Sequence, residues 1–137
     1  PSARRPIRLL GSLQAAIPSA TRHLPEWFAR KPLDEIARAA RAMFKAARVR
    51  PDDVDLACVN ADASPLVMLA LRVYGVGRAR VNPHGGQLCE AALDGINDVI
   101  EAVRRLRGAP ASRARVALVS GSLLEPTSAV LLGADSP

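Results

Sequence analysis

The apolar residues of this chain recur at two spacings, which together predict a sheet with helices packed on it. Residues 6–14, PIRLLGSLQ, have the composition of a strand with a glycine near its middle. Residues 16–32 contain three prolines, so we expect an irregular surface loop there. From Asp34 onward the spacing predicts an amphipathic helix. Its apolar positions are Ile36, Ala40, Met43, Phe44 and Ala47.

The middle of the chain predicts one buried strand and two further helices. Residues 54–59 are expected to form a short buried strand, and residues 64–75 an apolar helix that ends at Gly75. After a turn at residues 82–86, the helical period predicts one long helix over residues 88–106. Its expected apolar face carries Ala92, Ile96, Val99, Ile100, Val103 and Leu106, and its expected polar face carries Asp94, Asp98, Glu101 and Arg105.

The chain closes with two short apolar segments, residues 115–123 and 127–133, joined by a turn that contains Pro126. They predict an antiparallel pair of strands. The predicted order is therefore strand, helix, strand, helix, helix, strand, strand. Apolar strands of this kind are buried on both sides, so we expect an α/β fold of βαβαββ type, with a mixed sheet and helices on both faces. The 137 residues suit one domain.

Composition removes several classes of function. The net charge of +6 comes mostly from arginine, but the basic residues are scattered and no aromatic-interleaved motif accompanies them, so nucleic acid is not an expected partner. No long apolar run or export signal is present, and we expect a cytoplasmic protein without a membrane span. Cys58 and Cys89 lack metal-ligand spacing, so both are expected to be buried, reduced thiols, and no metal site is predicted.

The Asn-Pro-His-Gly-Gly turn at residues 82–86 is the main candidate site. Gly85 and Gly86 permit positive φ angles, and the turn leads into a helix whose free N–H groups can face an anionic or carbonyl oxygen. The alternative is that the two glycines only allow tight packing. For His84, hydrogen bonds to neighbouring backbone carbonyls are favoured over contact with a ligand.

The stretch NPHGGQLCEAALDGINDVIEAVRRLRG resembles a long pattern of the thiolase-like lipid-transfer-protein branch, which includes sterol carrier protein thiolases and retro-aldolases. That pattern reads Asn-Thr-His-Gly-Gly-Gln-Leu-Ser-Glu, then Gly-Met-Asn, then Glu-Ala-Val-Arg-Gln-Leu-Arg-Gly. Residues 49–75 and 116–132 are similar to the strand, loop and closing hairpin of the same branch. The resemblance covers most of the chain and implies that residues 1–137 form a thiolase C-terminal-like half.

The departures from the branch concern its chemistry. The resemblance puts the catalytic His of thiolases, or the Tyr of retro-aldolases, at Ala92, and the second thiolase Cys at Val119. The Asn-Glu-Ala-Phe loop corresponds to residues 60–63, where Asn60 alone is retained. Because acid–base catalysis needs a proton-transferring group, we expect no catalytic residue in this chain. The expected substrate-binding residues, for a coenzyme A thioester and without any cofactor, are Asn60, Asn82, His84, Gly85 and Gly86.

The resemblance also implies a partner. In a complete thiolase the two halves share a central layer of helices, so a lone half would expose the helix predicted after the turn, and an exposed apolar patch predicts an interface. The leading hypothesis is a non-catalytic accessory subunit that completes an acyl-CoA-handling enzyme with a thiolase-like chain or a homodimer mate. An OB-fold and zinc-ribbon acyl-CoA-binding protein is a further expected companion. Two alternatives stay open: a pocket-forming subunit of an active thiolase or retro-aldol lyase, and a stand-alone acyl-CoA or lipid-binding module.

Overall fold

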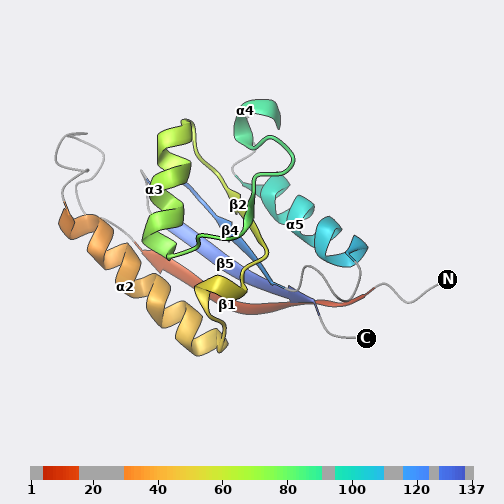
Figure 1. Ribbon diagram of the computed structural model, residues 1–137, viewed down its shortest axis with the longest axis horizontal. Helices are drawn as coiled ribbons and strands as arrows, with labels where there is room; N and C mark the ends of the chain where they lie inside the picture. The colour runs from red at the N-terminus through yellow and green to blue at the C-terminus, as the bar shows by residue number, and fades with distance from the viewer. Residues whose placement is uncertain (1–4, 16–29, 91–94, 110–115, 124–126, 135–137) are drawn as a thin grey trace.

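The fold is a mixed sheet with helices on both faces, as the sequence predicted, and the described part of the sheet has five strands where four were expected (Figure 1). The computed structural model describes residues 5–15, 30–90, 95–109, 116–123 and 127–134. Across the sheet the strands run β1 (Ile7–Ala15), β5 (Thr127–Ala134), β4 (Val116–Ser120), β2 (Leu56–Val59) and β3 (Arg80–Val81). β5 is antiparallel to both β1 and β4, which confirms the predicted closing pair, whereas β4, β2 and β3 are parallel.

Strand β2 is buried on both faces, and its alternating side chains divide the core in two. Ala57 and Val59 belong to a core beneath α2 (Arg30–Ala47) and α3 (Ser64–Tyr74). Leu56 and Cys58 point the other way, into a smaller core beneath α5 (Ile96–Gly108). Figure 1 shows α2 and α3 together on one side of the sheet and α5 on the other.

Several predicted boundaries shift by a few residues. Helix α2 begins at Arg30, so the prediction of a loop over residues 16–32 is wrong for residues 30–32. Residues 16–29 lie outside the described chain. A proline is tolerated in a first helical turn, where its missing N–H has no partner to lose. Before β2, a short 3₁₀ helix spans Pro51–Asp53, and the strand begins at Leu56 rather than at residue 54.

The end of α3 follows the sequence closely. Gly75 lies in the left-handed region at φ 72° and its N–H donates to the carbonyls of Arg72 and Leu71, which ends the helix as predicted. The next segment contains the two-residue strand β3, which sequence reasoning missed because so short a strand has no period of its own.

The single long helix expected over residues 88–106 is wrong. The structure has a short helix α4 (Gln87–Glu90) and a separate helix α5 that begins at Ile96. Gly95 precedes α5 in the left-handed conformation, at φ 81°, and a residue with this conformation cannot continue a right-handed helix. Residues 91–94, which include the expected catalytic position Ala92, lie outside the described chain.

The two faces of α5 also differ from the prediction. Ala102 and Leu106 pack on the sheet, but Asp98 and Glu101 are buried beside them. Ile96 and Ile100, which belong to the expected apolar face, are 54% and 57% exposed and so do not pack on the sheet. The apolar stripe was too wide to determine which side of the helix faces the sheet. Both buried carboxylates have basic partners, His84 for Asp98 and Arg105 for Glu101.

Glu101 is held by two arginines of its own helix. Arg104 donates to both of its carboxylate oxygens, at 2.8 and 3.0 Å, and Arg105 donates through Nε to Oε1. Arg105 also donates to the backbone carbonyl of Pro83, at 3.3 Å, which ties α5 to the turn at residues 82–86. The hydrogen bonds from Arg104, and after them those from Arg105, lower the pKa of Glu101 to about 2, although burial acts in the opposite direction.

We expect Glu101→Gln to lower the free energy of unfolding at pH 7 by about 1–2 kcal/mol, a figure reduced from the full pKa shift because Arg104 is solvent-exposed. The folded-state pKa lies below the unfolded one, so this stabilisation is present above about pH 5 and is lost as the pH falls toward 2. Urea denaturation of both proteins from pH 7 to pH 2 measures it: the difference should shrink toward acid pH. Asp53→Asn, which removes an exposed Arg50 pair, is the control and should change stability less. A constant difference across the pH range would contradict the assignment.

Candidate functional site

The candidate site lies where three parallel strands end at one edge of the sheet. β2 ends at Val59, β3 at Val81 and β4 at Ser120, and their following residues meet there. Asn60 donates its backbone N–H to the carbonyl of Ser120 at 2.8 Å, so the chain after β2 stays paired to β4. Ligand sites of open α/β sheets commonly occupy the carboxyl ends of the strands.

Asn82 fastens the turn to the end of β2. Its Oδ1 accepts from the backbone N–H of Val59 at 2.7 Å, and its Nδ2 donates to the carbonyl of Val59 at 3.0 Å. Just beyond β3, the side-chain amide of Asn82 thereby takes the place of a backbone amide that would pair with Val59 in a longer strand. Its backbone takes a positive φ of 40°, which asparagine tolerates better than most residues. Both groups of this amide are used inside the protein, so Asn82 shapes the site through the backbone of the turn.

The two glycines of the turn are required by its geometry, as the sequence predicted. Gly85 and Gly86 have φ angles of 99° and 70°. A Cβ on Gly85 would stand 2.6 Å from Sγ of Cys89, and one on Gly86 would stand 3.0 Å from Nδ2 of Asn82. Tight packing, the alternative interpretation of these glycines, is therefore part of their role. The same contact places Cys89 beside the turn, where it is exposed and not buried as expected.

A shallow cavity of about 270 Å³ lies between this turn and α3. Its surface is largely apolar, and its lining includes Met68, which is 63% exposed. A cavity of this size suits a short apolar segment of a ligand, since sites for whole drug-sized ligands are mostly larger. Its lining includes Ser64, Val67, Met68, Asn82, Gly85 and Gly86.

The five predicted site residues do not form one cluster. Asn82, Gly85 and Gly86 line the cavity beside α3. Asn60 lies near Gly95 instead, with its side-chain nitrogen 3.6 Å from where a Cβ of that glycine would be. His84 is turned away from the cavity, toward α5, and its side chain is buried.

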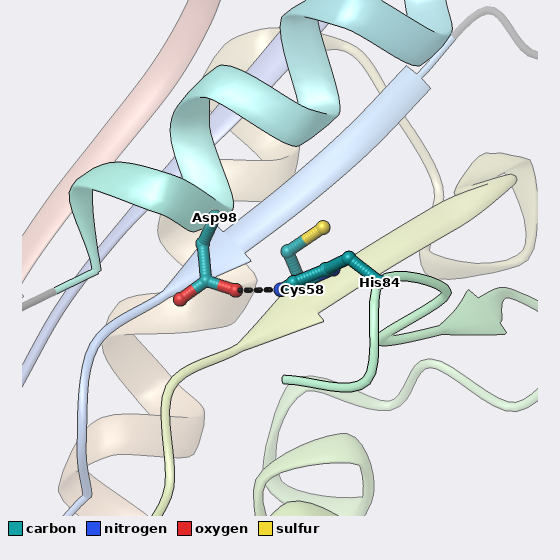
Figure 2. Close-up of side chains that lie close together, drawn as sticks. All are labelled: Cys58, His84 and Asp98. Atoms are coloured by element: carbon teal, nitrogen blue, oxygen red, sulfur yellow. Dashed lines mark ion pairs between the residues drawn. The ribbon is translucent and has the colours of Figure 1, made fainter. Parts of the chain in front are cut away.

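His84 meets a carboxylate and a thiol that sequence reasoning did not connect with it (Figure 2). Its Nε2 lies 3.1 Å from Oδ1 of Asp98, an ion pair if the imidazole is protonated, and both side chains are buried. This carboxylate is a partner that the favoured interpretation, backbone carbonyls alone, did not include. Cys58 of β2 brings its Sγ to the same place, so that one ligating atom from each residue lies within 4.8 Å of the other two.

No local signal in the sequence could have found this cluster. Cys58 lies on a strand, His84 in a turn and Asp98 on a helix, so no fixed spacing relates them. Asp98 was expected on the solvent face, and only the packing of α5 on the sheet buries it. Val119, where the resemblance expects a cysteine, pairs with Cys58 across β2 and β4 in the same core. The thiol of this chain thus lies one strand away from the expected position.

Two proteins with assigned activities are similar to the chain in sequence. A 17-hydroxy-3-oxo-4-pregnene-20-carboxyl-CoA lyase of Mycobacterium tuberculosis is 30% identical, in a match that covers 74% of this chain and 32% of the lyase. A steroid side-chain-cleaving aldolase of Thermomonospora curvata is also 30% identical, covering 75% of this chain and 32% of the aldolase. No family model matches the chain.

Solved structures agree on the fold. The Ltp2-ChsH2(DUF35) aldolase superposes with a TM-score of 0.80 at 24% identity, over 98% of this chain and 41% of that one. A monomeric SCP2-thiolase like protein type 1 from Mycobacterium smegmatis superposes with a TM-score of 0.69 at 17% identity, over 93% of this chain and 29% of that one. This chain belongs to the thiolase-like lipid-transfer-protein branch.

This thiolase-like chain spans about a third of the length of the relatives that it matches in sequence. The resemblance drawn from the turn at residues 82–86 and the helix after it is confirmed, and so is the thiolase-like α/β fold. Within the described residues, no helix is long and apolar enough to cross a membrane.

We expect Gly85→Ala to lower the free energy of unfolding by about 1–3 kcal/mol, the usual range for a residue forced into an unfavourable backbone region. Thermal and urea denaturation measure the change. The matched control is Gly77→Ala, because a Cβ at Gly77 would meet nothing within 4 Å and its backbone needs no glycine. Equal effects of the two substitutions would show that the turn does not need the conformation assigned to it.

Proposed function

We propose that this chain forms one wall of the acyl-CoA site of a thiolase-fold enzyme and needs a complementary thiolase-like unit to complete that site. Its relatives include a carboxyl-CoA lyase and a steroid side-chain-cleaving aldolase, and it matches about a third of each. The substrate class that suits this relationship is an acyl-CoA thioester, with the coenzyme A thioester of a steroid side chain as the most direct example. The part of the fold that this chain does not supply would come from the complementary unit.

The exposed apolar ridge of α5 is the observation that carries this proposal. Ile96 and Ile100 project from the helix, and Val99 and Val103 are only partly covered. An open groove runs beside them, with Arg104 and Arg107 at its border. Large aliphatic side chains on one helix face, bordered by charged ones, are typical of a protein interface. The resemblance expects α5 in the central helix layer of a complete thiolase, where a second half would cover this ridge.

The chain is proposed to be non-catalytic by itself. Val119 is buried and apolar where the branch has a cysteine, so it has no proton to transfer. Ala92, at the position of the catalytic His or Tyr, has no titratable group either. The nucleophile and the acid–base residues would therefore belong to the complementary unit, while this chain would contribute the turn at residues 82–86 and the cavity beside α3.

Two kinds of partner follow from this arrangement. The first is a thiolase-like half or a second copy of the chain, seated on the ridge of α5. The second is a DUF35 protein, because one similar structure, the Ltp2-ChsH2(DUF35) aldolase, combines an aldolase with such a protein. We propose the first as necessary for a complete site and the second as an additional subunit.

We expect Ile100→Asp to weaken the complex by more than about tenfold, because it places a charge in the centre of an apolar interface. Light scattering on the chain, alone and co-expressed with a thiolase-like N-terminal half from the same genome, measures the mass of the assembly. Met68→Asp is the matched control, since Met68 is also a large exposed apolar residue but lies on α3. Circular dichroism should show both variants folded. A monomer of 14.5 kDa in both preparations would contradict the proposal.

The stand-alone binding module remains a second candidate because of the cavity beside α3. It predicts the opposite pattern in calorimetry with a short-chain acyl-CoA. The monomeric chain would bind the ligand saturably, Met68→Asp would weaken binding, and Ile100→Asp would leave it unchanged. Absence of binding by the monomer, together with binding by the assembled complex, would reject this candidate and support the composite site.

A further inference from the structure

The cluster of Cys58, His84 and Asp98 has the composition of a metal site. Thiolate, imidazole and carboxylate are the three side-chain groups that bind zinc in proteins. Here they come from the centre of β2, from the turn at residues 82–86 and from the first turn of α5. Cys58 is fully buried, and the side chains of His84 and Asp98 are 6% and 4% exposed. The three groups converge in the interior, between the sheet and α5 (Figure 2).

One divalent cation can balance the charge of this buried cluster. A carboxylate inside a protein is costly unless a cation or several hydrogen bonds accompany it. Asp98 is paired with His84, and the pair adjoins a core of Leu56, Ala102 and Leu106 that also contains the thiol of Cys58. A divalent cation balances one thiolate and one carboxylate and leaves the imidazole neutral. It would therefore neutralise the whole cluster.

A catalytic relay is the competing interpretation, and the distances disfavour it. In a Cys-His-Asp relay the imidazole stands between the thiol and the carboxylate, with one partner on each ring nitrogen. The two outer groups are then separated by the ring and two hydrogen bonds. In this chain the ligating atoms of Cys58 and Asp98 are themselves within 4.8 Å of each other. They surround a common point instead of lying at opposite ends of the ring.

We propose that Cys58, His84 and Asp98 bind one transition-metal cation of the zinc class. A tetrahedral zinc ion with bonds of about 2.0–2.3 Å separates its ligand atoms by about 3.5 Å. The 3.1 Å between His84 and Asp98 is already close to this value, and the upper limit of 4.8 Å requires only small side-chain movements. The thiolate favours zinc or cobalt over magnesium or calcium. Three protein ligands leave a fourth position for water or another ligand.

Metal binding would also join three parts of the fold. The turn at residues 82–86 is held to β2 by Asn82 and to α5 by Arg105, and a metal at this point would add a third connection. A ligand that binds only the folded state raises its stability. The proposal is independent of the acyl-CoA site, because it concerns the opposite side of the turn from the cavity beside α3.

Titration of the chelator-treated full chain with cobalt(II) tests the site directly. We expect one equivalent to bind, with the visible absorption of a tetrahedral ion and a near-ultraviolet charge-transfer band from a thiolate. Zinc should displace cobalt and raise the melting temperature. Cys58→Ser should abolish the charge-transfer band. His84→Gln and Asp98→Asn should each weaken metal binding at least as much as the loss of a residue that hydrogen-bonds to a ligand, which costs about 10–100-fold in affinity. Cys89→Ser, which removes the exposed thiol, is the matched control and should bind as the unmodified chain does.

The unmodified protein decides the outcome even where a variant fails to fold, which circular dichroism would show. Absence of saturable uptake of cobalt and zinc by the unmodified chain would overturn the proposal. A charge-transfer band that survives Cys58→Ser but disappears in Cys89→Ser would also overturn it, because the exposed thiol would then be the ligand. Fast alkylation of Cys58 that depends on His84 and is unaffected by zinc would overturn it in favour of the relay.

Discussion

The attachment of Asn82 to Val59 is the interaction on which the rest of the site depends. Parallel strands are joined by long crossovers and not by tight turns. Because β3 has only two residues, its backbone pairing with β2 is short, and the turn that follows it needs a further contact with the end of β2. Two hydrogen bonds between the side-chain amide of Asn82 and the backbone of Val59 provide it. Once the turn is fixed there, Gly85 and Gly86 face α3 and His84 faces α5. One polar contact thereby sets the direction of both sides of the turn.

Helix α5 has two faces with different requirements. Toward the sheet it places small and apolar side chains, Ala102 and Leu106, together with two carboxylates that are matched by basic partners. Toward the outside it presents Ile96 and Ile100. Packing on this sheet does not require large aliphatic residues at those positions, and solvent disfavours a row of them. A helix of this kind is consistent with a fold that is completed by another thiolase-like unit.

Helix α5 has a role in both the proposed interface and the proposed metal site, on opposite faces. The outer ridge would hold the partner, and Asp98 on the inner side would help to hold a metal. Arg105 links the helix to the turn through Pro83, so the position of α5 affects both the ridge and the cluster. A metal that fixed α5 against β2 would also fix the surface offered to the partner. Cys58, which pairs with Val119 on the neighbouring strand, would take part in this attachment.

The sequence by itself determined the features that depend on local periodicity and local backbone geometry. The closing strand pair, the helix that ends at Gly75 and the glycine turn were all predicted, because residues a few positions apart decide them. The tertiary structure decided the break before α5, the burial of its carboxylates and the meeting of Cys58 with His84 and Asp98. Residues 26 and 14 positions apart acquire these partners only when a strand, a turn and a helix pack together, and no spacing along the chain encodes that contact.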